Sequence, residues 1–380
     1  MAKSAKFLGT AAALVALALS CGEPLGPLEP RWAKFDGFPA GCNVLALSAS
    51  PWGDGTLRAV ARNAEYKYVI LKYFRGEFTE EYVCPYEYDQ AWVADVAFGG
   101  SQGWAVGGKR RGNVRVPLVL RYGGADAGWL ELEMPAGAEG VVSAAYPTAA
   151  DRAVWFLIDK DYDEGEFLMN GLRKGTLARY SQGELKFYEK LGRVTAALSS
   201  DPRAAGVVYA VSCPLKEYSE GEEAVIFVSG DNGGTWAEEK LRRDHLLGYE
   251  INWVRAVGVD SADLYLLAGL EPHGFMGLIK RTGAPGVGVY GLVFLARYGP
   301  YFNELRGMAF HDPTGSTAAG GAEAVAVGDE TCVVRCDGRF YQEVLPYPVT
   351  MTSVTYAGGT GFWATARNKV IGGYELWYHP

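Results

Sequence analysis

The chain lacks the periodicity of helices and any extended basic tract. After residue 25, no segment keeps apolar residues at i, i+3, i+4 and i+7 over the roughly 11 residues that a helix requires. The longest basic block is Lys109-Arg110-Arg111, and the formal net charge is −8. Nucleic acid binding needs a wider basic footprint, so we expect an all-β protein without a nucleic acid partner.

Metal-binding and catalytic patterns are also scarce. The 380 residues contain six cysteines and four histidines, without a Cys-x-x-Cys pair or a histidine cluster. There is no Gly-x-Ser-x-Gly sequence and no phosphate-binding loop. We therefore expect no cofactor and no metal centre, and a non-catalytic role is favoured over an enzyme.

A short pattern of apolar, any, small, apolar, small and apolar residues occurs seven times. Successive copies start 46 to 60 residues apart, a spacing typical of repeat architectures. The copies are Val44–Ala49, Val93–Phe98, Val141–Tyr146, Val194–Ser199, Val254–Val259, Leu305–Phe310 and Met351–Tyr356.

Further strand-like runs follow most copies. A second apolar run comes next, then two apolar residues with a base, as in Ile70-Leu71-Lys72 and Leu295-Ala296-Arg297, and then a run after a glycine turn. Four antiparallel strands per repeat make one blade of a β-propeller. The 50 glycines suit its hairpins, and the aromatic residues suit the spaces between blades.

The last repeat ends at Pro380 without a clear fourth strand. Residues 31–39 resemble the fourth strands of other repeats, including their terminal proline. We expect this N-terminal strand to complete the last blade and close a seven-bladed ring. The predicted propeller spans residues 31–380.

The N-terminus has the features of an export signal. Lys3 and Lys6 precede an apolar run that is too short to span a bilayer but suits a signal peptide of residues 1–20. Leu17-Ala18-Leu19-Ser20-Cys21 resembles the bacterial lipobox, which implies lipidation at Cys21. An ordinary cleaved signal is the alternative. Residues 21–30 are rich in proline, as expected of a stiff tether. The predicted location is the bacterial cell envelope, on the periplasmic side or the cell surface.

Five more cysteines remain, and export permits disulfides. Cys42 precedes the first strand of the first repeat and Cys84 ends its fourth, which places both toward one face. We expect a disulfide between them.

The segment Ser229-Gly230-Asp231-Asn232-Gly233-Gly234-Thr235-Trp236 resembles the Asp-box of sialidase-type propellers. The resemblance implies a turn between the third and fourth strands, folded by Ser229 and Asp231. It also implies an unusual backbone angle at Gly233, and Trp236 between blades. Gly103-Trp104-Ala105-Val106-Gly107 is similar to repeats of the photosystem II assembly-factor propellers. Both resemblances concern the fold and supply no catalytic residue.

A sialidase also needs a convergent arginine triad. Here arginines recur at one repeat position, as Arg121, Arg179 and Arg297, which favours a structural role. A carbohydrate-binding or glycoside-acting propeller remains the alternative function.

An acidic segment alternates carboxylates at Asp159, Asp161 and Asp163, as calcium loops do. Its sixth position is Glu164 instead of glycine, so a solvated acidic loop is the favoured interpretation and a calcium site the alternative.

In propellers, the connections between second and third strands share one face with those between consecutive blades. Loops on a rigid scaffold commonly carry function, and Trp and Arg are usual hot-spot residues. We therefore predict a monomeric interaction or assembly scaffold whose partner is another envelope protein or a glycan. The candidate binding residues on this face are Asn63, Trp92, Lys109, Arg110, Arg193, Trp253 and Arg367.

Overall fold

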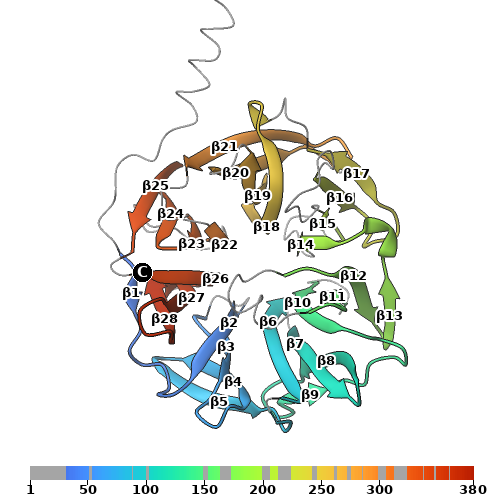
Figure 1. Cartoon of the computed structure of the whole chain (residues 1–380), viewed down its shortest axis with the longest axis vertical. Coiled ribbons are helices and arrows are strands. Elements are labelled where there is room, and N and C mark those ends of the chain that lie inside the picture. Colours follow the sequence, from blue (N-terminus) through green and yellow to red (C-terminus); the bar gives the residue numbers. More distant parts are fainter. Residues whose placement is uncertain are drawn as a thin grey trace, which may run out of the picture.

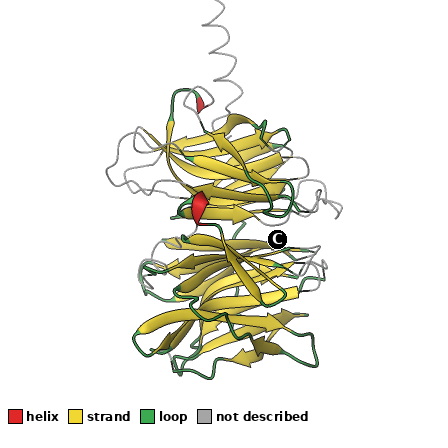
Figure 2. Cartoon of the chain, turned by 90° about the vertical axis from the view of Figure 1, so that its right-hand side faces the viewer, coloured by secondary structure: helices red, strands yellow, loops and turns green. Residues whose placement is uncertain are grey.

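The computed structural model is a closed ring of seven four-stranded antiparallel sheets (Figure 1). It describes residues 31–380 except 51–53, 88, 100–101, 149–152, 163–172, 199–205, 213–223, 242–245, 261–262, 272–274, 285, 298–304, 312–322, 337, 346–347 and 359. The predicted signal peptide, Cys21 and the predicted tether thus lie outside the described residues. Figure 2 shows the ring from its edge. The seven-bladed propeller predicted from the repeats is confirmed.

Each blade places its first strand at the centre and its fourth at the rim. The first strands are β2 (Asn43–Ala49), β6 (Ala91–Gly99), β10 (Val141–Pro147), β14 (Val194–Leu198), β18 (Glu250–Asp260), β22 (Leu305–Phe310) and β26 (Val349–Ala357). The second are β3 (Leu57–Arg62), β7 (Gln102–Arg111), β11 (Val154–Asp159), β15 (Val208–Ser212), β19 (Asp263–Glu271), β23 (Ala324–Gly328) and β27 (Gly361–Asn368).

The third strands are β4 (Tyr68–Phe74), β8 (Val114–Tyr122), β12 (Thr176–Ser181), β16 (Val225–Ser229), β20 (Phe275–Thr282), β24 (Thr331–Cys336) and β28 (Tyr374–His379). The outer strands are β5 (Glu77–Val83), β9 (Trp129–Glu131), β13 (Glu184–Phe187), β17 (Ala237–Lys240), β21 (Val289–Arg297), β25 (Arg339–Val344) and, in blade seven, β1 (Ala33–Lys34). One short 3-10 helix, η1 (Glu189–Leu191), follows β13. No helix within the described part of the chain is long and apolar enough to cross a bilayer.

A β-bulge explains the repeated sequence pattern. In every blade the first strand carries one extra residue relative to the second strand, near the start of the pattern. Such a bulge increases local twist, and here it recurs in all seven strands around the channel. The shifts fall between Val44 and Ala46, Val93 and Asp95, Val142 and Ala144, Val194 and Ala196, Val254 and Ala256, Leu305 and Gly307, and Met351 and Ser353.

Neighbouring first strands are also joined directly. The backbone N–H of Ala49 in blade one donates to Oγ1 of Thr355 in blade seven (3.3 Å). The N–H of Phe98 in blade two donates to Oγ of Ser48 in blade one (3.1 Å). Short polar side chains in the pattern thus accept hydrogen bonds from backbone N–H groups at the channel wall that would otherwise lack a partner.

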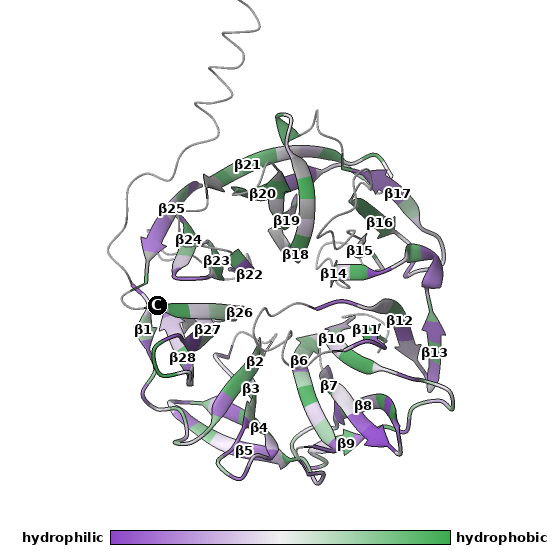
Figure 3. Ribbon diagram, in the orientation of Figure 1, coloured by the Kyte–Doolittle hydropathy of each residue, from purple (hydrophilic) through white to green (hydrophobic). Residues whose placement is uncertain are grey.

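The apolar core lies between the faces of adjacent blades. Between blades two and three, for example, Trp104 and Val106 pack against Val154 and Phe156. Figure 3 shows hydrophilic residues gathered on outer strands such as β13, β17 and β25. This distribution is expected when each sheet buries both faces and exposes its rim.

The N-terminal strand closes the ring, as predicted, but β1 is shorter than expected. It pairs Ala33 with Tyr378 and Lys34 with Trp377 of β28. The closure depends on side chains as well. The indole of Trp32 donates to Sγ of Cys332 in blade six (3.0 Å), and its ring lies edge-on to His379 at 5.5 Å.

One strand assignment made from the sequence is wrong. The segment Leu295–Tyr298 was expected to be a third strand, but residues up to Arg297 belong to the outer strand β21, and β20 is the third strand. β20 carries the same apolar-apolar-base pattern at Leu278-Ile279-Lys280, so the pattern alone did not distinguish neighbouring strands.

The predicted disulfide is not formed, because Cys42 and Cys84 are free thiols. Cys42 packs against residues between blades seven and one, while Cys84 belongs to the core between blades one and two. The two side chains therefore lie on opposite sides of blade one.

Candidate functional site

A cavity of about 490 Å³ opens on blade two, on the face that carries the connections between second and third strands. Two of the predicted binding residues, Lys109 and Arg110, line it. The full lining is Tyr86, Lys109, Arg110, Arg111, Val116, Pro117, Glu131, Leu132, Glu133, Met134, Pro135, Ala136, Gly137 and Ala138. Its volume is within the usual range of ligand sites, about 300–1,000 Å³.

Pro117 explains why the cavity exists. The outer strand β9 pairs only with Leu120–Tyr122, although β8 begins at Val114. The N–H of Leu132 donates to the carbonyl of Val119 and the N–H of Gly140 to that of Arg115, so the chain rejoins β8 at both sides of Pro117. Proline has no N–H to continue a ladder. The segment between these two contacts leaves the sheet and forms the outer wall.

An ion pair occupies one side of the cavity. The ammonium group of Lys109 lies 2.5 Å from Oε1 of Glu131 and donates to the hydroxyl of Tyr86 (3.2 Å). That hydroxyl in turn donates to Oε2 of Glu131 (3.0 Å). Partial burial disfavours the charge of Lys109, but these hydrogen bonds outweigh it and raise the pKa of Lys109. Lys109 thus stays protonated, and its positive charge is balanced by the carboxylate of Glu131.

Arg110 and Arg111 differ from Lys109. Both are exposed at the end of β7, beside the two-residue turn that leads to β8. Among the residues that the structure describes, neither guanidinium group has an ion-pair partner. They are the cations at this cavity that remain available to an anionic ligand.

The other predicted binding residues do not form one site. Trp92 is only 7% exposed, because its ring stacks on Tyr162 and lies beneath the guanidinium of Arg115 at 5.5 Å. Trp253 is half-buried between blades, with Arg255 over its ring at 4.8 Å. The prediction of Trp92 as an exposed anchor is therefore wrong.

The remaining three predicted binding residues lie on different blades. The side chain of Asn63 accepts hydrogen bonds from the N–H groups of Glu65 and Lys67 and so folds the β3–β4 turn. Arg193 is exposed before β14, and Arg367 is half-buried in β27. They are carried by blades one, four and seven.

The acidic segment is only partly described. Asp159 is buried at the end of β11, where Oδ1 accepts the N–H of Asp161 (3.0 Å) and lies 4.0 Å from the Arg193 guanidinium. Burial raises the pKa of Asp159. Asp163 lies outside the described residues. Within those residues, no three His, Cys, Asp or Glu side chains are grouped to hold a metal ion.

Ser229, Asp231, Gly233 and Trp236 form a closed turn between β16 and β17. Oγ of Ser229 accepts the N–H of Gly233 (2.7 Å), and the Asp231 carboxylate accepts both the N–H and the hydroxyl of Thr235 (2.7 and 2.8 Å). The hydrogen bonds from Thr235 lower the pKa of Asp231 to about 2. Gly233 has φ +82°, and Trp236 packs edge-on against Trp155 of blade three at 5.9 Å. These contacts fold the turn and pack it against blade three, which is a structural role; the turn lies on the face opposite the blade-two cavity.

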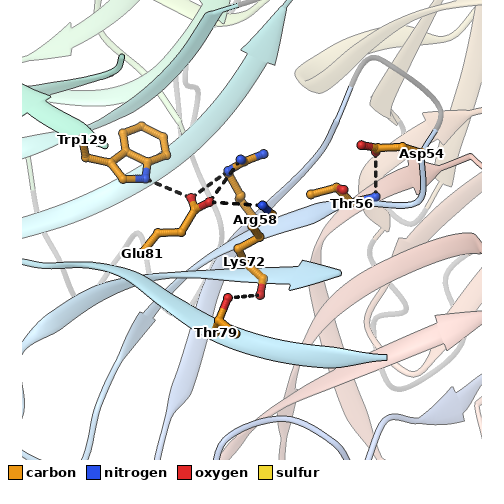
Figure 4. A network of polar contacts seen from close by, with 7 residues as sticks. All are labelled: Asp54, Thr56, Arg58, Lys72, Thr79, Glu81 and Trp129. Carbon is orange, nitrogen blue, oxygen red and sulfur yellow. Dashed lines mark hydrogen bonds and ion pairs between the residues drawn. The ribbon is translucent and has the colours of Figure 1, made fainter. Parts of the chain in front are cut away.

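Sequence reasoning missed a set of glutamates between blades. Glu81 of β5 accepts two hydrogen bonds from buried Arg58 (2.9 and 3.2 Å) and one from the indole of Trp129 in blade two (3.2 Å; Figure 4). The Arg58 guanidinium also lies over the ring of Phe98 in blade two at 4.4 Å. Glu81 and Arg58 therefore join blade one to blade two.

The same arrangement recurs at two other boundaries. Glu239 of blade four is bonded by Arg281 (2.6 and 2.8 Å) and Tyr290 of blade five. Burial alone would raise the pKa of Glu239, but these hydrogen bonds outweigh it and hold that pKa below its ordinary value. Glu343 of blade six lies 3.3 Å from Nε2 of His379 in blade seven. The signal that could have found them is an aromatic residue three positions earlier: Phe78, Trp236 and Phe340.

One more buried carboxylate lies on a first strand. Asp95 of β6 accepts the N–H of Ala145 (3.2 Å) and pairs with Arg173 (2.9 Å), both in blade three. Burial raises the pKa of Asp95 despite these contacts. The contacts with Ala145 and Arg173 join blade two to blade three, which is a structural role.

Comparison with solved structures confirms the architecture. The chain is similar to YCF48 from Cyanidioschyzon merolae, with a TM-score of 0.55 and 12% identity over 92% of this chain and 99% of that one. A chain of the mitotic checkpoint complex gives a TM-score of 0.55 and 10% identity over 94% of both chains. Sqt1 of Saccharomyces cerevisiae gives 0.51 and 11% identity over 93% of this chain and 88% of Sqt1.

No protein-family model and no curated protein sequence matches the chain. At these identities the likeness shows a shared seven-bladed fold and nothing about a site.

Proposed function

We propose that the chain is an exported, lipid-anchored propeller that serves as a non-catalytic docking scaffold for another protein of the cell envelope. β-Propellers commonly act as interaction scaffolds. The lipobox-like sequence at Cys21 supports the anchor.

The observation that carries the proposal is a set of exposed apolar hairpin tips on one face. Val370 and Ile371, between β27 and β28, are 75% and 72% exposed, and Tyr66, between β3 and β4, is 61% exposed. Val114, at the start of β8, is also exposed. These residues belong to consecutive blades seven, one and two, beside the blade-two cavity. Apolar side chains exposed on hairpins of three consecutive blades, all on one rigid face, favour a protein partner.

Chain direction supports a suitable orientation. Because β1 ends at the connection to blade one, residue 31 enters it from the opposite face, where the Ser229–Trp236 turn lies. A tether from Cys21 would therefore attach on the face away from the hairpin tips. In this arrangement the docking face is turned from the bilayer toward a partner.

A glycoside-acting protein is the second candidate, because two carboxylates, Glu131 and Glu133, line the cavity. Glycoside hydrolysis uses a pair of carboxyl groups. However, Glu131 is already held by Lys109 and Tyr86. Hydrolysis of a glycan panel that is lost in Glu133→Gln would favour this candidate over the scaffold.

The scaffold proposal is tested by cross-linking in intact envelopes, followed by quantitative mass spectrometry. Ile371→Asp and Tyr66→Asp should each reduce the recovery of a specific partner at least tenfold. The matched control is Val287→Asp, which alters a residue 68% exposed on the opposite face, between β20 and β21. A partner captured equally by all variants, or none above background, would refute the proposal. Separately, Cys21→Ala should move the protein from the membrane to the soluble fraction.

A further inference from the structure

We propose that the blade-two cavity binds a short, extended acidic segment of a partner protein. Carboxylates of the segment would pair with Arg110 and Arg111, and an aliphatic side chain would pack on Val116, Pro117 and Met134. The inference rests on the proposed scaffold function for the identity of its ligand as a protein.

The charges of the lining favour a carboxylate ligand. The lining carries three cations and two carboxylates, Glu131 and Glu133. Lys109 is bonded to Glu131, whereas Arg110 and Arg111 are exposed and have no ion-pair partner among the described residues, so two guanidinium groups outnumber the one remaining carboxylate. A guanidinium group binds a carboxylate through two parallel hydrogen bonds. Because both arginines lie at the hairpin end, an incoming acidic segment meets them before it reaches the interior.

The apolar lining of the cavity is aliphatic apart from Tyr86, which favours a peptide over a glycan. This aliphatic wall consists of Val116, Pro117, Leu132, Met134, Pro135 and Ala138. Tyr86 is the one aromatic residue of the lining, and its hydroxyl and ring are engaged by Glu131 and by the Lys109 ammonium at 5.1 Å. A sugar would therefore find no free aromatic face, while a Leu or Val side chain would lose water against this wall.

The dimensions fit about four extended residues. The cavity lies along β8 between Arg115 and Val119, whose carbonyls accept the N–H groups of Gly140 and Leu132. Four residues of strand span about 13 Å at 3.3 Å per residue. Since backbone hydrogen bonds fix both ends of the outer wall, the cavity is formed before the ligand arrives, which limits the entropic cost of binding.

The test begins by selecting binders from a random decapeptide library with the purified, signal-cleaved protein as the bait. The same selection is run in parallel with the double variant Arg110→Gln/Arg111→Gln as the bait. Both arginines are exposed, so the variant should fold. The wild-type selection should enrich peptides that combine Asp or Glu with Leu, Ile or Val, and the variant selection should not. Enrichment of basic or purely apolar peptides, or equal enrichment on both proteins, would overturn the proposal.

The best peptide is then measured by fluorescence anisotropy. Each single substitution, Arg110→Gln or Arg111→Gln, should weaken binding about tenfold, and replacing the peptide's acids by amides should have a similar effect. Arg121→Gln is the matched control, because Arg121 is exposed on the same strand but outside the cavity. Equal weakening by Arg121→Gln, or tighter binding of polygalacturonate than of the peptide, would overturn the inference. If the peptide fails to compete with the partner cross-linked at the hairpin tips, this inference fails while the scaffold function stands.

Discussion

Trp32 should control whether the ring stays closed, although β1 contributes only two paired residues. Its side chain is 3% exposed, donates to Sγ of Cys332, and packs edge-on against His379. Replacing a buried tryptophan by alanine costs about 3–5 kcal/mol, which is a large share of the 5–15 kcal/mol that typically separates folded from unfolded states. Trp32→Ala should therefore weaken the boundary between blades six and seven more than the rest of the ring.

The assay is thiol labelling of the native protein, read out site by site by mass spectrometry. Cys332 is fully buried, and burial, followed by the nearby Glu343 carboxylate, raises the pKa of its thiol well above the ordinary value. In the wild type it should react slowly. In Trp32→Ala, local opening should accelerate its labelling about a hundredfold or more, because 3 kcal/mol corresponds to a factor of roughly 150 when opening precedes labelling.

Two controls make the result interpretable. Cys84 is equally buried, but between blades one and two, so its labelling should be unchanged. Trp32→Phe keeps an aromatic ring but loses the hydrogen bond to Cys332 and part of the buried volume, so it should cost more than the roughly 1 kcal/mol of the hydrogen bond and less than Trp32→Ala. If the labelling of Cys332 and of Cys84 becomes faster to the same extent, the opening is global and the reasoning about a local closure is wrong. The reasoning is equally refuted if the labelling rate of neither thiol increases.

Two further stability predictions concern other blades. Glu239→Gln should cost about 3 kcal/mol at neutral pH, because it leaves a buried arginine uncompensated. Since the pKa of Glu239 is held below its ordinary value, its contribution is complete above about pH 4.3 and is lost as the pH falls through the folded-state pKa. In urea unfolding, the difference in unfolding free energy between Glu239→Gln and the wild type should become smaller below about pH 4. The exposed neighbour Glu238 is the control, and Glu238→Gln should unfold like the wild type at every pH. A difference for Glu239→Gln that does not change with pH would contradict the role given to the Glu239 carboxylate. Gly233→Ala should cost more stability than Gly183→Ala, which should cost roughly 1 kcal/mol. Both glycines have a positive φ, but an added Cβ at Gly233 would lie 2.4 Å from Trp155, whereas one at Gly183 would contact nothing within 4 Å. Equal melting temperatures of the two variants would refute this steric reason.

The number of blades could be predicted from sequence because the repeat is physically enforced. Every first strand needs the same bulge and the same small residues around the channel, so the pattern survives in all seven copies. The third strand of blade five could not be assigned, because β20 and β21 both carry apolar residues followed by a base. Strand patterns reflect the burial of apolar side chains, and both strands bury them: Leu278 and Ile279 in β20, and Leu292 and Phe294 in β21.

The candidate site was only partly predictable. Lys109 and Arg110 were placed on the correct face by counting connections, but their roles depend on Glu131, which is brought to Lys109 by the outer strand. The order of the strands gives the end of the sheet at which a residue lies, but not the face of the sheet to which its side chain points. That limitation also explains the mistaken Cys42–Cys84 disulfide and the buried Trp92, since successive side chains of a strand point to opposite faces.

The glutamates between blades bear on why the sequence of the proposed docking face can change without loss of the fold. The apolar clusters between blades are chemically similar, so they provide stability but little information about which blade faces which. Glu81, Glu239 and Glu343 each reach a different partner type in the next blade: an indole, an arginine with a tyrosine, and a histidine. A mispaired neighbour would leave Glu239 or Glu343 buried without its partner, at a cost of several kcal/mol, and would remove the Trp129 hydrogen bond from Glu81. Because these contacts come from the outer strands β5, β17 and β25, the hairpins between second and third strands take no part in them and can change sequence while the ring beneath stays rigid.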